Sequence, residues 1–77
     1  MKRYTVFVGA PNRDPIDDPP LWAQVKANDY AKALDKTRKA FAADFEEAGV
    51  ELPNDGNEED FPLVMIVEGW PKFVTEL

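Results

Sequence analysis

The stretch that decides the fold is NDYAKALDKTRKAFAADFEEAGV, residues 28–50. Aromatic, aliphatic and small side chains recur in it at steps of three and four, which places them on one face of a helix. Asn28 is expected to be the N-cap, because its side-chain carbonyl can accept from the amides of the first turn. Gly49 is expected to end the helix in the left-handed conformation, with Val50 folding back onto Phe45. The predicted buried stripe is Tyr30, Leu34, Thr37, Phe41, Phe45 and Ala48.

Three further segments have the composition of strands. Residues 3–9, RYTVFVG, alternate in a way that puts Tyr4, Val6 and Val8 on one face. Residues 21–27, LWAQVKA, alternate similarly. Residues 63–67, LVMIV, are apolar at every position, as expected of a strand in the middle of a sheet. Residues 72–77 either add a short terminal strand or cover a surface.

The order of these elements is ββαβ. A right-handed crossover through the helix makes the second and third strands parallel, while the first two strands can pair antiparallel. The sequence therefore predicts an α+β two-layer sandwich, in which a three-stranded sheet of order 2-1-3 packs on one long helix. A chain of 77 residues is expected to form a single domain, 1–77.

One helix can cover only one face of such a sheet. Phe7 and Trp22 are predicted to point to the opposite face, and exposed aromatic surface of this kind is often an interface. Two other arrangements remain open at this stage: the tail that begins at Trp70 folds back over this face, or a second copy of the chain covers it.

Acidic residues are concentrated in one interval of the chain. The formal net charge is −6, yet no basic residue lies between Lys39 and Lys72. That interval holds nine of the fifteen acids, namely Asp44, Glu46, Glu47, Glu51, Asp55, Glu58, Glu59, Asp60 and Glu68.

Three of these acids sit at the wrong end of the helix for stability. Asp44, Glu46 and Glu47 lie at the negative end of the helix dipole, where each exposed carboxylate costs about 0.3–1 kcal/mol. A local rule that is broken without compensation suggests a function. The alternative is that the acids only keep a small protein soluble.

Most enzyme chemistries are excluded by composition. The sequence has no His, Cys or Ser, which removes the imidazole base, the thiolate and the seryl nucleophile. Carboxylate-pair catalysis needs a substrate cleft, for which so short a chain offers little room. The four glycines are scattered singly, so no phosphate-binding loop is present. We predict a protein that is not an enzyme and takes no cofactor.

Metal and nucleic-acid sites are not expected either. Residues 55–60, DGNEED, offer oxygen donors, but a calcium loop would need glycine in place of Asp60 and glutamate in place of Ile66. The basic residues on the helix are interrupted by Asp35, which can pair with Lys39 at i, i+4. Direct binding to nucleic-acid phosphates is therefore not predicted. The apolar runs are too short for a membrane span, and a cytoplasmic location is expected.

In size, acidity, absence of catalytic side chains and mixed α/β pattern, the chain resembles small phage-encoded inhibitors, including anti-CRISPR proteins and DNA mimics. The resemblance lies in overall character, so no functional residue is carried over from it. It implies a non-enzymatic protein that blocks DNA binding by a bacterial defence complex.

Two functional hypotheses follow from the residues. In the first, the acidic stretch binds a basic, nucleic-acid-binding surface of a protein partner, and Phe7, Trp22 or Trp70 supplies aromatic anchors. Its partner-binding carboxylates are Asp44, Glu46, Glu47, Glu51, Asp55, Glu58, Glu59 and Asp60. In the second, the chain is a structural or accessory module that homodimerises or docks through an exposed apolar sheet face. High salt should release a charge-driven partner but not an apolar one.

Overall fold

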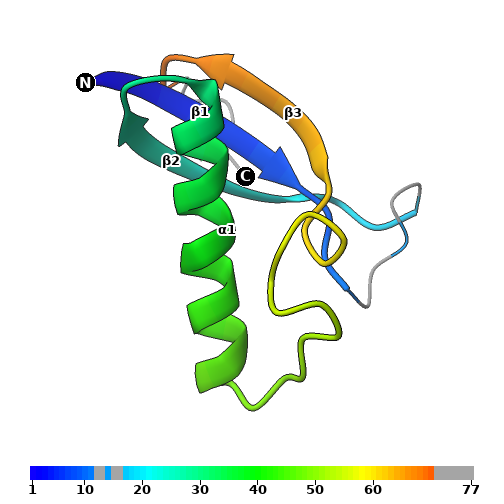
Figure 1. The fold of residues 1–77 in the computed structure, drawn as a ribbon. Helices are drawn as coiled ribbons and strands as arrows, with labels where there is room; N and C mark the ends of the chain where they lie inside the picture. The colour runs from blue at the N-terminus through cyan, green and yellow to red at the C-terminus, as the bar shows by residue number, and fades with distance from the viewer. Residues whose placement is uncertain (12–13, 15–16, 71–77) are drawn as a thin grey trace.

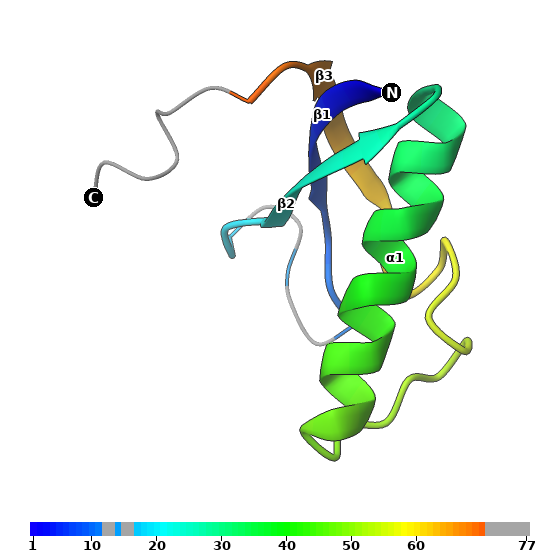
Figure 2. The same ribbon diagram turned by 90° about the vertical axis from the view of Figure 1, so that its left-hand side faces the viewer.

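A computed structural model describes residues 1–11, 14 and 17–70. The elements are β1 (Lys2–Val8), β2 (Leu21–Ala27), α1 (Tyr30–Glu47) and β3 (Leu63–Glu68). The three strands form one sheet. Figure 1 shows α1 crossing one face of this sheet, and Figure 2 shows helix and sheet as two layers. The predicted α+β, ββαβ architecture is confirmed. The terminal strand considered for 72–77 lies outside the described residues.

The sheet has the predicted order, β2-β1-β3, with β1 in the centre. β1 is antiparallel to both neighbours, with Tyr4 opposite Val25 on one side and Val6 opposite Ile66 on the other. Strands β2 and β3 therefore run in the same direction, as the crossover through α1 predicts.

β3 is an edge strand, which corrects the expectation that residues 63–67 form a strand in the middle of the sheet. Leu63, Val64 and Met65 are 45%, 54% and 47% exposed. The pairing shifts between Phe7 and Val8, whose partners are Met65 and Leu63, so Val64 is left without a partner in a β-bulge. An unbroken apolar run marks a strand but does not say where that strand lies in the sheet.

The helix begins one residue later than predicted, because the N-cap is Asp29 rather than Asn28. Asp29 has extended backbone angles, and its Oδ1 accepts from Lys32 N at 2.8 Å. An N-cap side chain commonly accepts a hydrogen bond from the backbone amide three residues later, which for Asp29 is the amide of Lys32. The carboxylate also places a negative charge at the positive end of the dipole.

The C-terminal end of α1 is as predicted. Gly49 has φ of 79°. Its amide donates to Glu46 O at 3.0 Å, and Val50 N donates to Phe45 O at 2.9 Å. These two bonds form a Schellman motif, which satisfies carbonyls that the helix would otherwise leave unpaired.

The core lies between α1 and the sheet. Its fully buried members are Tyr4, Val6, Val8, Ala27, Ala33 and Phe61. On the helix, Ala33 and Thr37 are buried, while Tyr30 at one end of the predicted stripe is 52% exposed. Phe45 meets Phe61 edge-on, with ring centroids 5.3 Å apart. The buried stripe of the helix is therefore centred on Ala33 and Thr37. Phe61 packs the loop before β3 against the core.

Candidate acidic interface

The connection from α1 to β3 is organised around one buried carboxylate. Asp60 is 1% exposed. Its Oδ2 accepts from Gly56 N at 2.7 Å and Asn54 N at 3.0 Å, and its Oδ1 accepts from Asn54 Nδ2 at 3.3 Å. Three donors on one side chain fix a turn that would otherwise have unpaired amides. Asp60 thus holds the connection in shape.

That turn has the geometry expected from its Asp-Gly pair. Asp55 and Gly56 have φ of 58° and 79°, and Asn57 N donates to Asn54 O at 3.3 Å. Gly56 is buried, and a Cβ placed on it would lie 2.6 Å from Ala42 Cβ of α1. The connection is therefore packed against the helix at this point, and Figures 1 and 2 show it beside the C-terminal half of α1.

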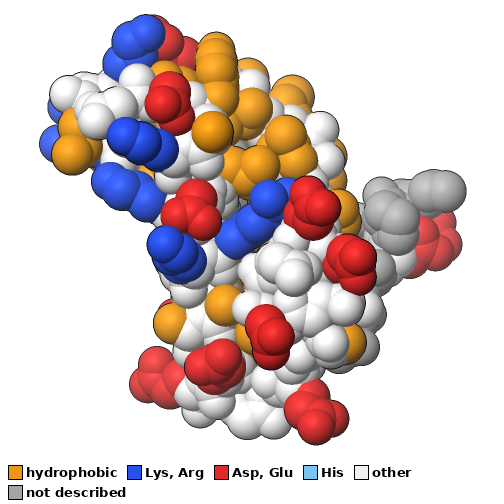
Figure 3. Space-filling model, viewed as in Figure 1, with side chains coloured by type: hydrophobic (Ala, Val, Ile, Leu, Met, Phe, Trp, Pro, Cys, Tyr) orange, Lys and Arg blue, Asp and Glu red, His pale blue; other side chains and the backbone are white. Residues whose placement is uncertain are grey.

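Seven acids surround this anchored turn on the surface, and together we call them the acidic end. They come from the last turns of α1 and from the connection that follows, and all are exposed: Asp44, Glu46, Glu47, Glu51, Asp55, Glu58 and Glu59. In Figure 3 the lower part of the visible face carries acidic side chains and no basic ones. No ion pair joins any of the seven to a basic residue of the described ranges.

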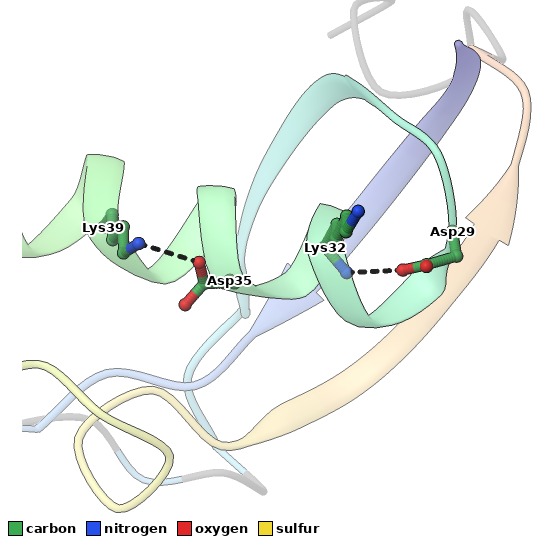
Figure 4. A network of polar contacts seen from close by, with 4 residues as sticks. All are labelled: Asp29, Lys32, Asp35 and Lys39. Carbon is green, nitrogen blue, oxygen red and sulfur yellow. Dashed lines mark hydrogen bonds and ion pairs between the residues drawn. The ribbon is translucent and has the colours of Figure 1, made fainter.

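Three basic side chains of the helix, in contrast, make polar contacts within the fold. Figure 4 shows the Lys39–Asp35 ion pair, whose atoms are 2.9 Å apart, and the pairing predicted at i, i+4 is confirmed. Lys36 Nζ donates to Lys26 O, and Arg38 Nε donates to Phe61 O at 2.9 Å. None of these contacts neutralises the acidic end.

Asp60 does not belong to the acidic end. The expectation that it presents its carboxylate to a partner is wrong for this conformation, because the side chain is buried and its oxygens are used by the turn. The sequence carries a signal for this role, since Asn and Asp commonly bond nearby backbone amides in turns. A charge count does not distinguish such a carboxylate from a solvated one.

The predicted aromatic anchors lie on the sheet face away from α1. Phe7 is 7% exposed and so is not a surface anchor, which corrects the prediction for this residue. Trp22 and Trp70 are 38% and 37% exposed. They are therefore the two anchors that remain available, although they are not on the helix side of the molecule.

Trp70 folds back over the open sheet face, in agreement with the expectation that the tail beginning at Trp70 covers this face. Its Nε1 donates to Tyr4 O at 3.2 Å, and Arg3 Cζ lies 4.7 Å from the ring centroid. Next to it, the buried Thr5 hydroxyl donates to Gly69 O at 2.7 Å. This face is thus covered in part by residues 69–70; the rest of the tail proposed to cover it, 71–74, lies outside the described residues.

Comparison with known protein families, curated proteins and solved structures finds no match to this chain. Among the described residues, no group of three or more carboxylates is arranged to hold a metal ion. No described helix has the length and apolar character needed to cross a membrane. The functional assignment therefore rests on the geometry of the acidic end.

Proposed function

We propose that this protein is a non-enzymatic inhibitor whose acidic end occupies a basic, nucleic-acid-binding surface of a partner protein. The observation that carries the proposal is the group of seven exposed carboxylates without a basic residue among them or paired to them in the described ranges. Such a group concentrates negative potential at one end of a molecule whose principal extents are 31 × 27 × 20 Å.

The position of three of the acids supports a role beyond solubility. Asp44, Glu46 and Glu47 lie in the last turn of α1, which contains no compensating base. Acids placed elsewhere on the surface would give the same solubility without opposing the helix dipole. Their retention here is explained if a partner supplies the missing positive charge.

The partner class follows from charge complementarity. A surface that binds DNA carries Lys and Arg arranged to neutralise closely spaced phosphates and to release their counterions. A dense group of carboxylates offers the same surface an alternative ligand, and opposite potentials accelerate the encounter. We include in the proposal that the partner is a DNA-binding complex of a bacterial defence system, as in anti-CRISPR-type inhibitors.

The test uses two variants of equal net charge. The first neutralises the acidic end with Glu46→Gln, Glu47→Gln and Glu58→Gln. The second neutralises three exposed acids elsewhere, with Asp17→Asn, Asp35→Asn and Glu68→Gln. Asp35 and Glu68 form surface ion pairs, whose loss costs at most about 1 kcal/mol each.

Each protein is immobilised and exposed to nuclease-treated bacterial lysate, and retained complexes are assayed for DNA binding. We expect the native protein and the second variant to capture a DNA-binding complex and inhibit its DNA binding, and the first variant to lose both effects. Inhibition should weaken with rising salt, because exposed charges are screened. Equal inhibition by the two variants would exclude the acidic end as the inhibitory surface.

The same substitutions should make the isolated protein more stable. Glu46→Gln and Glu47→Gln remove two negative charges from the negative end of the helix dipole, each worth about 0.3–1 kcal/mol, which predicts a gain of about 0.6–2 kcal/mol in the free energy of unfolding. Urea denaturation at low salt measures it. The mid-helix control Asp35→Asn should show no gain, because it lies away from the helix end and loses its ion pair with Lys39. A loss of stability would mean that these carboxylates make favourable contacts within the fold, and that they need no partner to explain them.

The alternative function, docking of an accessory module through apolar surface, is favoured by a different observation. Three consecutive side chains of β3 are about half exposed, whereas Phe7 on the open sheet face is buried. The apolar surface available for docking therefore lies at β3, where the exposed Met65 pairs with Phe7 on the open face, rather than at the centre of that face. Salt-insensitive association would support this second function over the first.

A further inference from the structure

The outer edge of β3 has backbone groups that no described strand pairs. β3 has β1 on one side and no described strand on the other. Gly69 N donates to Arg3 O at 2.7 Å, so the alternation of an antiparallel pair directs the backbone groups of Met65 and Val67 toward β1. Those of Ile66 and Glu68 are directed outward. These outward groups can accept another strand.

Apolar side chains flank the same edge. Leu63, Val64 and Met65 are 45%, 54% and 47% exposed, and Figure 3 shows hydrophobic side chains gathered over β3. Sheet edges are commonly protected by lysine or proline, and the residues of β3 include neither. Its single charge is Glu68 at the end of the strand. An edge of this composition is suited to strand pairing.

We propose that β3 pairs antiparallel with β3 of a second copy, which joins the two sheets into one of six strands. The symmetry axis is placed at Ile66. The outward N–H of each Ile66 can then donate to the outward C=O of Ile66 in the other copy. Met65 of each copy comes to lie opposite Val67 of the other, so apolar side chains meet across the junction.

Charge favours a second copy in this antiparallel orientation. The start of β3 follows the exposed Glu58 and Glu59. Its other end lies beside the basic start of β1, where Lys2 Nζ is 3.7 Å from Glu68 Oε1. Antiparallel pairing places the acidic start of each strand near the basic end of the other, and the two-fold symmetry repeats this contact. Parallel pairing would place like charges together.

The dimer should be reversible, because one strand edge is a small interface of the kind seen in weak complexes. Sedimentation equilibrium over a concentration series tests it. We expect the mass of the native chain to rise from 8.7 kDa toward twice that value. Val64→Lys with Met65→Lys should keep the mass at the monomer value. Ala31→Lys with Ala40→Lys adds the same charge at exposed helix positions and should leave the dimer intact.

Cross-linking tests the register. The native chain has no cysteine, so a single Ile66→Cys provides the only thiol. Mild oxidation should link this variant into a covalent dimer much faster than a Lys32→Cys variant, whose thiol would lie on the exposed helix. Circular dichroism checks that each variant is folded.

Three results would overturn the proposal: a native chain that is monomeric at every concentration, a Val64→Lys, Met65→Lys variant that dimerises like the native chain, or equal cross-linking rates for the two cysteine variants. The first result would leave an extended segment of another protein as the remaining candidate for the edge. None of the three bears on the acidic end, because an inhibitor that acts as a monomer needs no self-pairing.

Discussion

Replacing Asp60 by alanine should lower the free energy of unfolding by about 3 kcal/mol, because each buried amide left without an acceptor costs about 1–3 kcal/mol. Two such amides, Gly56 N and Asn54 N, share Asp60 Oδ2 at 2.7 and 3.0 Å. A domain of this size has a total stability on the order of 5 kcal/mol, so the loss is a large part of it. Urea denaturation followed by circular dichroism measures the change.

Asp60→Asn is the matched control, since it removes the same charge but keeps an oxygen. An asparagine can hold its carbonyl where Oδ2 lies and accept from both backbone amides, while the Asn54 side chain turns to accept from its NH₂. We expect a loss of about 1 kcal/mol, the difference between a charged and a neutral acceptor. Equal destabilisation of both variants would mean that Asp60 stabilises the fold through its negative charge and not through the position of its oxygen atoms.

This pair of variants also separates shape from charge at the acidic end. Four of the seven exposed acids, Glu51, Asp55, Glu58 and Glu59, belong to the connection that Asp60 holds. Asp60→Ala should therefore disperse them and weaken partner inhibition, whereas Asp60→Asn should preserve it. Equal inhibition by the two Asp60 variants would mean that the partner recognises the net charge of the acidic end and not the arrangement of its carboxylates.

The fold was predictable because its determinants are local. The alternation in residues 3–9 and 21–27, the helical period after Asp29 and the left-handed glycine at 49 each specify an element from neighbouring residues alone. The handedness of the crossover then leaves few sheet orders, and the observed order is among them. The one-residue error at the N-cap arose because Asn28 and Asp29 are both good capping residues.

The site was less predictable because burial depends on contacts distant in the sequence. Asp60, Glu58 and Glu59 are adjacent acids with the same formal charge, yet only Asp60 is buried. Its burial follows from Phe61, which is fully buried and packs against Phe45. In the same way, Met65 is half exposed because it lies on an edge strand, opposite Phe7 on the face that α1 does not cover, and the unbroken apolar run of residues 63–67 does not indicate this.

Replacing Gly56 by alanine should lower the free energy of unfolding by about 2–4 kcal/mol. An alanine at φ of 79° carries left-handed strain of about 1 kcal/mol, and its Cβ would lie 2.6 Å from Ala42 Cβ, where overpacking costs about 1–3 kcal/mol. Chemical denaturation reports the total. The connection would have to move away from α1, which would also stretch the bond between Gly56 N and Asp60.

Gly49→Ala isolates the backbone contribution to that loss. Gly49 has the same φ of 79°, but a Cβ added there meets no atom within 4 Å. It should therefore cost only the strain, about 1 kcal/mol. Ala42→Gly tests the packing contribution from the other side: it costs about 1 kcal/mol alone, as glycine does inside a helix, but should relieve the clash in combination with Gly56→Ala. If the two losses were simply additive, α1 and the connection would not be in contact at this point. The support that the helix gives to the acidic end would then have to come from other contacts, such as that between Phe61 and Phe45.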